Sequence, residues 1–184
     1  MNTGDSIMIA GDLIQHGWGV SSPIGTIAFG DGPAIVVGLT GNNEGQPLTF
    51  TWNGTASNTV LSGSDYGTNV FDLAPGNDTV TFGNSRLGGS GANMLSFEKG
   101  DGQVHVALNG STGTIRMASD IAESDVILQS DAAGDLIVKL RDTGDSITVQ
   151  ADLTKYWWGV TSQIGQIVFG DGSAMAVGQA AWHH

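Results

Sequence analysis

Four stretches of this sequence can be written as rows of nine residues with the same internal order. Residues 64–72 and 73–81 read SDYGTNVFD and LAPGNDTVT, and residues 88–96 and 97–105 read GGSGANMLS and FEKGDGQVH. Every row has glycine at its fourth position and an apolar residue at its eighth, as in the nonapeptide pattern G-G-x-G-x-D-x-U-x. The rows therefore predict a parallel β-roll, in which each row supplies one tight turn and one short strand.

Three positions of each row have a physical role in such a roll. The fourth positions permit a positive φ and leave backbone carbonyls accessible; they are Gly67, Gly76, Gly91 and Gly100. The eighth positions are expected to point into the core; they are Phe71, Val80, Leu95 and Val104. The sixth positions are Asn69, Asp78, Asn93 and Gly102. Calcium takes about 6–8 oxygen ligands, which two stacked loops can supply from carbonyls and side chains where one loop cannot.

The rest of the chain favours strands as well. Short apolar segments lie between clusters of Gly, Asn and Asp, for example in Asp135–Leu140, Ser146–Val149 and Gln166–Phe169. Segments of this length with flanking turn residues are typical of strands. The best candidate for a helix is short, Ala118–Ser124. We therefore predict an all-β fold, a parallel β-roll or β-helix of degenerate nonapeptides flanked by small β modules.

The sequence also contains an internal repeat. Asn2–Gly38 aligns with Asp142–Gly178 without a gap, and 21 of 37 positions are identical. The copies are offset by 140 residues, so Leu39–Gly178 is one full unit preceded by the end of another. We interpret the chain as a piece of a longer array. The predicted divisions are a partial copy and candidate cap at 1–38, a linker and first strand at 39–52, the roll at 53–110, a β module at 111–178, and a tail at 179–184. His183 and His184 are either residues of a tag or part of a native tail.

The charge of the chain restricts its partners. There are 18 acidic residues against 6 lysines and arginines, which gives a net charge of −12. Such a chain repels nucleic acid and anionic membranes, while divalent cations would neutralise it. There is no cysteine, which excludes disulfides, thiolate zinc sites and cysteine nucleophiles.

Taken together, the sequence resembles the RTX (haemolysin-type) calcium-binding repeat proteins. Residues 111–178 resemble the β domain that accompanies such repeats, the haemolysin-type calcium-binding protein related domain. The resemblance rests on the nonapeptide rows and on Gly113–Leu128, Asp135–Val149 and Ile164–Gly172. It implies a calcium-dependent fold, export by a type I secretion system, and a location outside the cell or at its surface.

The rows depart from the family pattern at the sixth position. Only the row 73–81 has aspartate there, and that row lacks the first two glycines of the pattern. Fewer charges imply fewer or weaker sites, and we expect one to three calcium ions. The candidate ligands are Asp78 first, then the side chains of Asn69, Asn93, Asp65 and Asp101 and the carbonyls of Gly76 and Gly91. The alternative is that these are turn residues of a β-helix that holds no metal.

These features predict a non-catalytic, calcium-binding structural module of a large secreted or cell-surface protein, which folds on calcium binding after export. Its expected partners are neighbouring copies of the same repeat. No nucleophile elbow, zinc-protease motif or Walker motif is present, so nothing in the sequence favours an enzyme.

The alternative function is binding of an extracellular polysaccharide by exposed Trp and Asp side chains on a β face. The aromatic candidates are Trp18, Trp157 and Trp158. Core or inter-module packing is the other interpretation of these tryptophans. Asp31 and Asp171 lie in Asp-Gly pairs, which favour hairpin turns without any further role.

Overall fold

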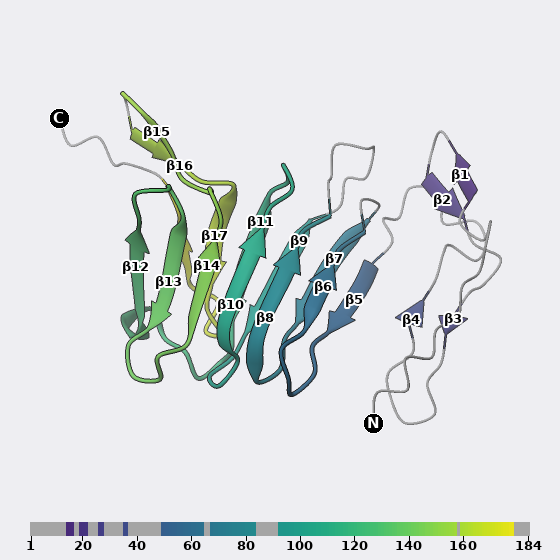
Figure 1. The fold of residues 1–184 in the computed structure, drawn as a ribbon, viewed down its shortest axis with the longest axis horizontal. Helices are drawn as coiled ribbons and strands as arrows, with labels where there is room; N and C mark the ends of the chain where they lie inside the picture. The colour runs from purple at the N-terminus through teal and green to yellow at the C-terminus, as the bar shows by residue number, and fades with distance from the viewer. Residues whose placement is uncertain are drawn as a thin grey trace.

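The computed structural model describes residues 49–64, 67–83, 92–157 and 159–178, together with the backbone of four short strands between residues 14 and 36. Two six-stranded sheets form the body of the protein (Figure 1). Sheet I has the order β18-β17-β11-β9-β7-β5 and sheet II the order β12-β13-β14-β10-β8-β6. The strands of sheet I are β5 (Thr49–Asn53), β7 (Thr68–Asp72), β9 (Asn93–Phe97), β11 (Gly113–Met117), β17 (Ile164–Val168) and β18 (Ala174–Ala176). The strands of sheet II are β6 (Val60–Ser62), β8 (Gly76–Thr81), β10 (Gly102–Ala107), β12 (Val126–Ser130), β13 (Leu136–Leu140) and β14 (Ser146–Val149).

The chain passes back and forth between the two sheets from β5 to β11. Strands β5, β7, β9 and β11 are parallel neighbours in sheet I, and β6, β8 and β10 are parallel neighbours in sheet II. In the first turn Phe50 pairs with Asn69 and Val60 with Thr79, so each strand meets the strand 19 residues further on. That advance is close to two rows of nine. The predicted all-β fold with a parallel roll is confirmed.

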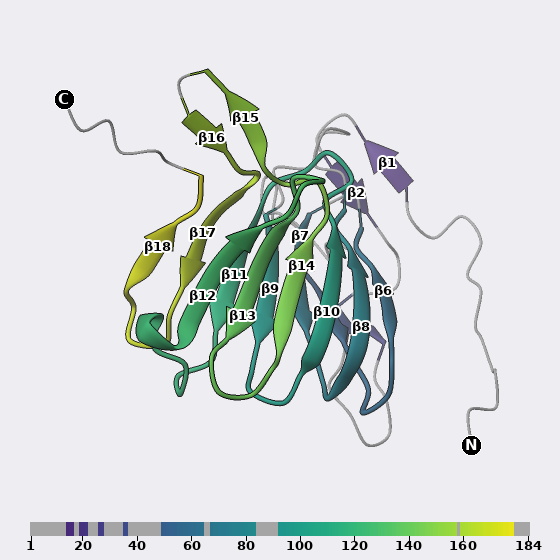
Figure 2. The ribbon, with the colours of Figure 1, turned by 60° about the vertical axis from the view of Figure 1, so that its left-hand side comes forward.

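The final third of the chain continues the same two sheets. Strand β14 pairs in parallel with β10, and β17 pairs in parallel with β11. The other strands added here are antiparallel: β13 lies beside β14, β12 beside β13, and β18 beside β17. Figure 2 shows these strands at one end of the roll, with the hairpin of β15 (Thr154–Tyr156) and β16 (Gly159–Thr161) projecting from it. The strands on both sides of residue 110 thus share two sheets, while the domain divisions drawn from the sequence stay a prediction.

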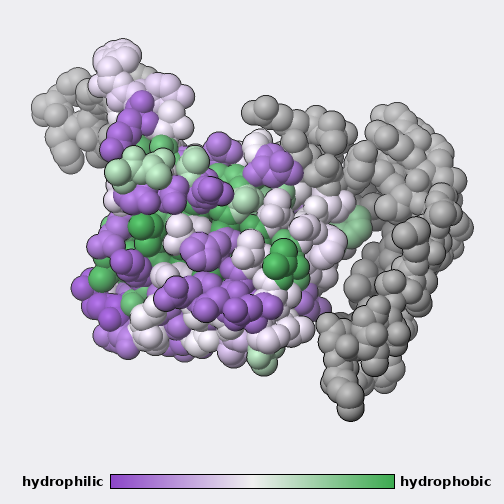
Figure 3. Space-filling view, viewed as in Figure 1, coloured by the Kyte–Doolittle hydropathy of each residue, from purple (hydrophilic) through white to green (hydrophobic). Residues whose placement is uncertain are grey.

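The core lies between the two sheets. Phe71, Val80, Leu95 and Val104, the eighth positions of the four rows, are each no more than 1% exposed. Figure 3 shows hydrophilic residues over most of the described face in that view, with hydrophobic residues in smaller areas. The sequence favours a short helix at Ala118–Ser124, but the structure has only a 3-10 turn nearby, η2 (Glu123–Asp125). Strand β11 ends at Met117, directly before the predicted helix. The periodicity of nine thus places every apolar eighth position inside.

The internal repeat is also a repeat of backbone pairing. Strand β1 (Ile14–His16) pairs with β2 (Gly19–Ser21) in the same register as β15 with β16, since each pair is displaced by 140 residues. Strand β3 (Thr26–Ile27) pairs with β4 (Ile35–Val36) in the same register as β17 with β18. The two copies therefore share their hairpins as well as their sequence.

Candidate metal site

The sixth positions of the nine-residue rows lie in two lines, one on each sheet. Asn69 and Asn93 are paired on the neighbouring strands β7 and β9 of sheet I, and each is 1% exposed. Asp78 lies on β8 of sheet II and is fully buried. Alternation along a strand explains this placement, because the sixth and eighth positions are two residues apart and face the same side. The same sequence rule therefore directs both amides and the carboxylate into the interior.

The two asparagines of sheet I form a ladder. The amide nitrogen of Asn69 donates to the side-chain oxygen of Asn93 at 3.0 Å and to the Ser64 carbonyl at 2.8 Å. The side-chain oxygen of Asn69 accepts from the indole of Trp52 at 3.0 Å and from the Ser64 N–H at 2.8 Å. Both halves of the Asn69 amide are therefore occupied by protein groups.

Asn93 continues the ladder toward β11. Its side-chain oxygen accepts a second bond from the Gly83 N–H at 3.2 Å. Its nitrogen donates to the carbonyls of Gly83 and Thr112 and to the hydroxyl of Ser111, each at 3.2 Å. An amide oxygen has two lone pairs, and here both are used in each asparagine. As arranged, this line is hydrogen-bonded without an ion.

The carboxylate of Asp78 is in a different situation. One oxygen accepts the Thr59 N–H at 2.8 Å. The other oxygen is buried and has no hydrogen-bond partner among the described residues. A buried carboxylate oxygen without a partner is costly, and it normally indicates a missing proton, water or cation. Asp78 is thus the described residue that best fits a metal ligand.

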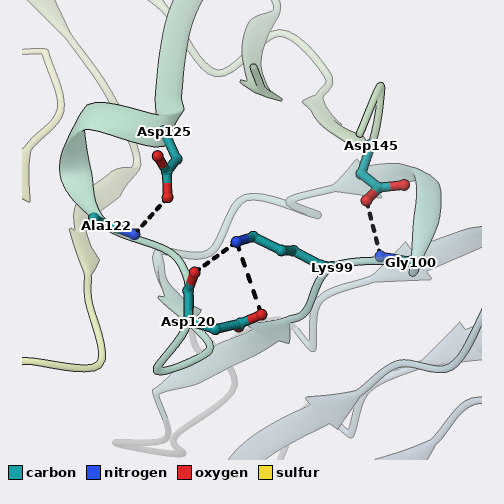
Figure 4. Close-up of polar contacts among 6 residues, drawn as sticks. All are labelled: Lys99, Gly100, Asp120, Ala122, Asp125 and Asp145. Atoms are coloured by element: carbon teal, nitrogen blue, oxygen red, sulfur yellow. Dashed lines mark hydrogen bonds and ion pairs between the residues drawn. The ribbon is translucent and has the colours of Figure 1, made fainter. Parts of the chain in front are cut away.

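Two further buried aspartates lie near the starts of the neighbouring strands of sheet II. Asp101 directly precedes β10 and is 4% exposed, and Asp145 directly precedes β14 and is 7% exposed. Asp101 accepts the Glu98 N–H at 2.7 Å. Asp145 accepts the N–H groups of Gly100 and Gly102 at 2.8 and 3.2 Å, and the first of these bonds is drawn in Figure 4. These two acids hold the turn that enters β10. We call Asp78, Asp101 and Asp145 the acidic row.

The acidic row is electrostatically strained. Burial raises the pKa of Asp101 from 3.8 to about 6, although the hydrogen bond from the Glu98 N–H acts in the opposite direction. The negative charges of Glu98, Asp78 and Asp145 contribute to this rise. Like charges that share a site favour uptake of a proton or a cation. The single described ion pair nearby, Lys99 with Asp120 at 3.8 Å, lies at the surface and leaves the row unneutralised (Figure 4).

Two glycines let the backbones of β8 and β10 approach closely beside these acids. Gly102 has a φ of +79°, and a β-carbon at this position would collide with the carbonyl oxygen of Gly76. The Gly76 carbonyl, a predicted calcium ligand, therefore lies against a position from which a side chain is excluded. The absence of a side chain at the sixth position of the last row is thus a steric requirement of the fold.

The acidic row alone does not complete a coordination shell. Within residues 49–64, 67–83, 92–157 and 159–178, no three acidic or imidazole side chains are close enough together to hold an ion. The fit to a cation thus rests on the unpartnered oxygen of Asp78 and on the mutual repulsion of the acids. Asp65 and Gly91, also candidate ligands, lie outside the described residues.

Asp145 is the member of the acidic row that sequence reasoning missed. The sequence pattern gives it only a turn role because it falls outside the rows of nine. Its position directly before an apolar strand, in the repeated segment TGDSI, was a usable signal. A fourth buried aspartate, Asp152, is 1% exposed. It accepts hydrogen bonds from the Gln163 and Ile164 N–H groups and from the Ser162 hydroxyl. Asp152 fixes the base of the β15–β16 hairpin.

Other residues noted in the sequence have ordinary roles. Asp171 accepts from the hydroxyl and the N–H of Ser173 at 2.7 and 2.8 Å, and these bonds lower its pKa. It forms the expected turn, while Asp31 lies outside the described residues. Trp157 is 92% exposed and Tyr156 is 50% exposed, both at the tip of the β15–β16 hairpin. Trp18 and Trp158 are outside the residues whose side chains are described.

The segment that supplies Asp145 has a recognisable sequence. Residues 135–177 match the haemolysin-type calcium binding protein related domain. The matched residues run from β13 to β18 and so include the strands at this end of the roll except β12. The match confirms the resemblance seen in the sequence and indicates a calcium-binding repeat module. No curated protein matches the chain.

The described residues include no helix that is both long and apolar enough to cross a bilayer.

Proposed function

We propose that this chain is a non-catalytic structural module of a large secreted or cell-surface protein, and that calcium binding drives it to fold after export. The observation that carries the proposal is the fully buried Asp78, which has one oxygen without a described partner. Two other buried aspartates, Asp101 and Asp145, directly precede the next strands of the same sheet. The match of residues 135–177 to a calcium-binding related domain supports the choice of calcium.

The residues that would hold the ion are those of sheet II. Asp78 would supply carboxylate oxygen, Gly76 a carbonyl, and Asp101 and Asp145 negative charge from the adjoining turn. Calcium favours such hard oxygen ligands. Of the one to three ions expected from the sequence, the described residues support a site on sheet II. The satisfied asparagine ladder offers no free oxygen on sheet I.

The mechanism we propose is thermodynamic linkage. A chain with a net charge of −12 and 29 glycines loses much entropy and gains much repulsion when it folds. An ion that binds only the folded state adds about 2.7 kcal/mol of stability at 100 times its dissociation constant. Calcium is scarce inside cells and abundant outside, so the chain would stay expanded during type I export and fold in the extracellular space.

The test is a calcium titration of the full chain. Circular dichroism and thermal unfolding are recorded first in EDTA and then as calcium is returned. We expect a coil-to-strand transition or a large rise in Tm, with magnesium and added NaCl as controls for charge screening. Equal spectra and equal Tm values in EDTA and calcium would mean that the roll is metal-free.

The polysaccharide alternative has less support. It requires at least two exposed aromatic side chains in line along one face of a sheet. Among the described residues, the exposed aromatic side chains are Tyr156 and Trp157, which are adjacent at one hairpin. The family match also does not favour it.

A further inference from the structure

The two ends of the roll differ in how their sheets finish. At one end the antiparallel strands β12 and β18 form the last strands of the two sheets. At the other end the last strands are β5 and β6, which continue the parallel order of the roll (Figure 1). Any end strand leaves a row of backbone donors and acceptors directed outward, which natural proteins usually cover.

The outward groups of β5 can be assigned from its hydrogen bonds. The Gly54 N–H donates to the Asp72 carbonyl of β7. Because backbone groups alternate in direction along a strand, the N–H groups of Thr51 and Asn53 face away from β7. These two amides are therefore available to a further strand.

Apolar groups also come to the surface at this end. Phe50 and Trp52 lie on β5 with ring centroids 6.4 Å apart, and Trp52 stacks in turn on Phe71 at 6.4 Å. The side chains of Phe50 and Trp52 are half-buried, and Val60 on β6, the last strand of sheet II, is 76% exposed. The aromatic stack of the core thus runs to the end of the roll and would be extended by another layer.

The chain itself contains a suitable strand. Strands β3 and β4 repeat the pairing of β17 and β18 with the same register, and β4 lies next to β5 (Figure 1). In the full copy, the Phe169 N–H donates to the Ser173 carbonyl and the Val177 N–H to the Gly165 carbonyl. The Ala174 and Ala176 amides of β18 therefore face away from β17. Val36 is the equivalent of Ala176 and has the same outward amide in β4.

We propose that β5 is the docking edge for the terminal hairpin of the preceding copy, which in this chain is β3–β4, so that sheet I continues from one copy to the next. Strand addition of this kind uses main-chain hydrogen bonds for affinity and needs no particular side chain. Only residues 37–48 connect β4 to β5, so the hairpin is held at a high effective concentration beside its site. By the same pairing, β18 of this unit is the edge offered to a following copy. The inference deepens the interpretation of the chain as a piece of a longer array, and it is independent of the calcium binding in the proposed function.

The test follows individual amides by hydrogen exchange in the full chain, with calcium present so that the roll is folded. The amides of Thr51 and Asn53 should exchange at least tenfold more slowly than unprotected amides. Val36→Pro removes the outward donor of β4 without touching a β3 bond, and it should accelerate exchange at both positions by at least tenfold. Deletion of residues 2–38 should have the same local effect and should lower the Tm.

The matched control is Ser62→Pro. The Gly63 N–H donates to the Thr81 carbonyl, so the Ser62 amide faces away from β8 on the open edge of sheet II. This variant places the same residue on the neighbouring edge and should leave exchange at Thr51 and Asn53 unchanged. Core amides such as Leu95 should stay protected in all variants, which shows that the roll itself is intact.

Fast exchange at Thr51 and Asn53 in the unaltered chain would overturn the inference, and so would slow exchange that persists in Val36→Pro and in the deletion. The calcium midpoint, measured on the same samples, separates the two proposals. If Val36→Pro accelerates exchange at Thr51 and Asn53 but leaves the calcium midpoint unchanged, docking of the hairpin is supported. That result does not depend on whether the unaltered chain folds on calcium binding.

Discussion

The asparagines of sheet I and Asp78 of sheet II hold the same sixth position of the nine-residue row but differ in chemistry. Asn69 and Asn93 satisfy one another and their turns, whereas Asp78 keeps a buried oxygen without a described partner. An amide both donates and accepts, so stacked amides can form a closed chain of hydrogen bonds. An ionised carboxylate only accepts, so stacked carboxylates need a proton or a cation between them. One roll can thus contain one line of inward polar side chains that is stable without an ion and another whose stability depends on protons or cations.

The largest loss of stability is expected from placing a charge in the asparagine ladder with Asn69→Asp. The new carboxylate would face two acceptors, the Ser64 carbonyl and the side-chain oxygen of Asn93. Burying a charge against acceptors should cost about 4 kcal/mol of unfolding free energy. Urea denaturation in EDTA measures the loss. If calcium restored this variant to the stability of the unaltered chain, the ladder would itself be a potential ion site and the contrast between the lines would fail.

The next effect is expected from neutralising the acidic row with Asp78→Asn. The variant keeps an oxygen for the Thr59 N–H but removes the buried charge. The stabilisation by saturating calcium, about 3 kcal/mol at 100 or more times the dissociation constant, should fall below about 1 kcal/mol. Unfolding with and without calcium gives the difference. The matched control is Asp142→Asn, an exposed acid, which should respond to calcium like the unaltered chain. An undiminished calcium response in Asp78→Asn would remove Asp78 from the site.

The nine-residue period can be recognised in the sequence alone, and it predicts which side chains face inward. Fourth, sixth and eighth positions have the same parity, so the period by itself assigns Gly76, Asp78 and Val80 to one side of their strand. The identity of the core residues and the parallel winding follow from that rule.

What the sequence could not supply was the partner of each inward polar group. Trp52 and Gly83 lie outside the rows of nine, and no pattern in the sequence predicts that they complete the bonds of the ladder. Asp145 comes from a strand 43 residues beyond its parallel neighbour, after the β12–β13 detour. Such pairings depend on topology rather than on local pattern, which is why the sequence predicts the acidic row only in part.

A smaller effect is expected from pH. The raised pKa of Asp101, about 6, means that the folded state binds a proton more tightly than the unfolded chain, whose aspartates titrate near 3.8. Stability should therefore increase as pH falls from 7 through 6 and should level off below about 4, where both states are protonated. After allowance for solvent screening, we expect a gain of about 1.5 kcal/mol in EDTA. Asp101→Asn should flatten this part of the curve of unfolding free energy against pH. A curve of the same slope in this variant would assign the proton to another group.

The smallest effect is expected at the end of the ladder, in Ser111→Ala. The Ser111 hydroxyl donates to the Leu108 carbonyl at 2.6 Å and accepts from Asn93 at 3.2 Å. Its loss should cost about 1 kcal/mol, since Asn93 keeps its bonds to two carbonyls. Because no charge is involved, the urea midpoint should shift equally in EDTA and in calcium, and by the same amount at pH 5 and pH 7. The exposed Ser130→Ala provides the baseline. If the shift of the urea midpoint depended on calcium, the asparagine ladder and the acidic row would be energetically coupled, and the ladder would not be independent of the ion.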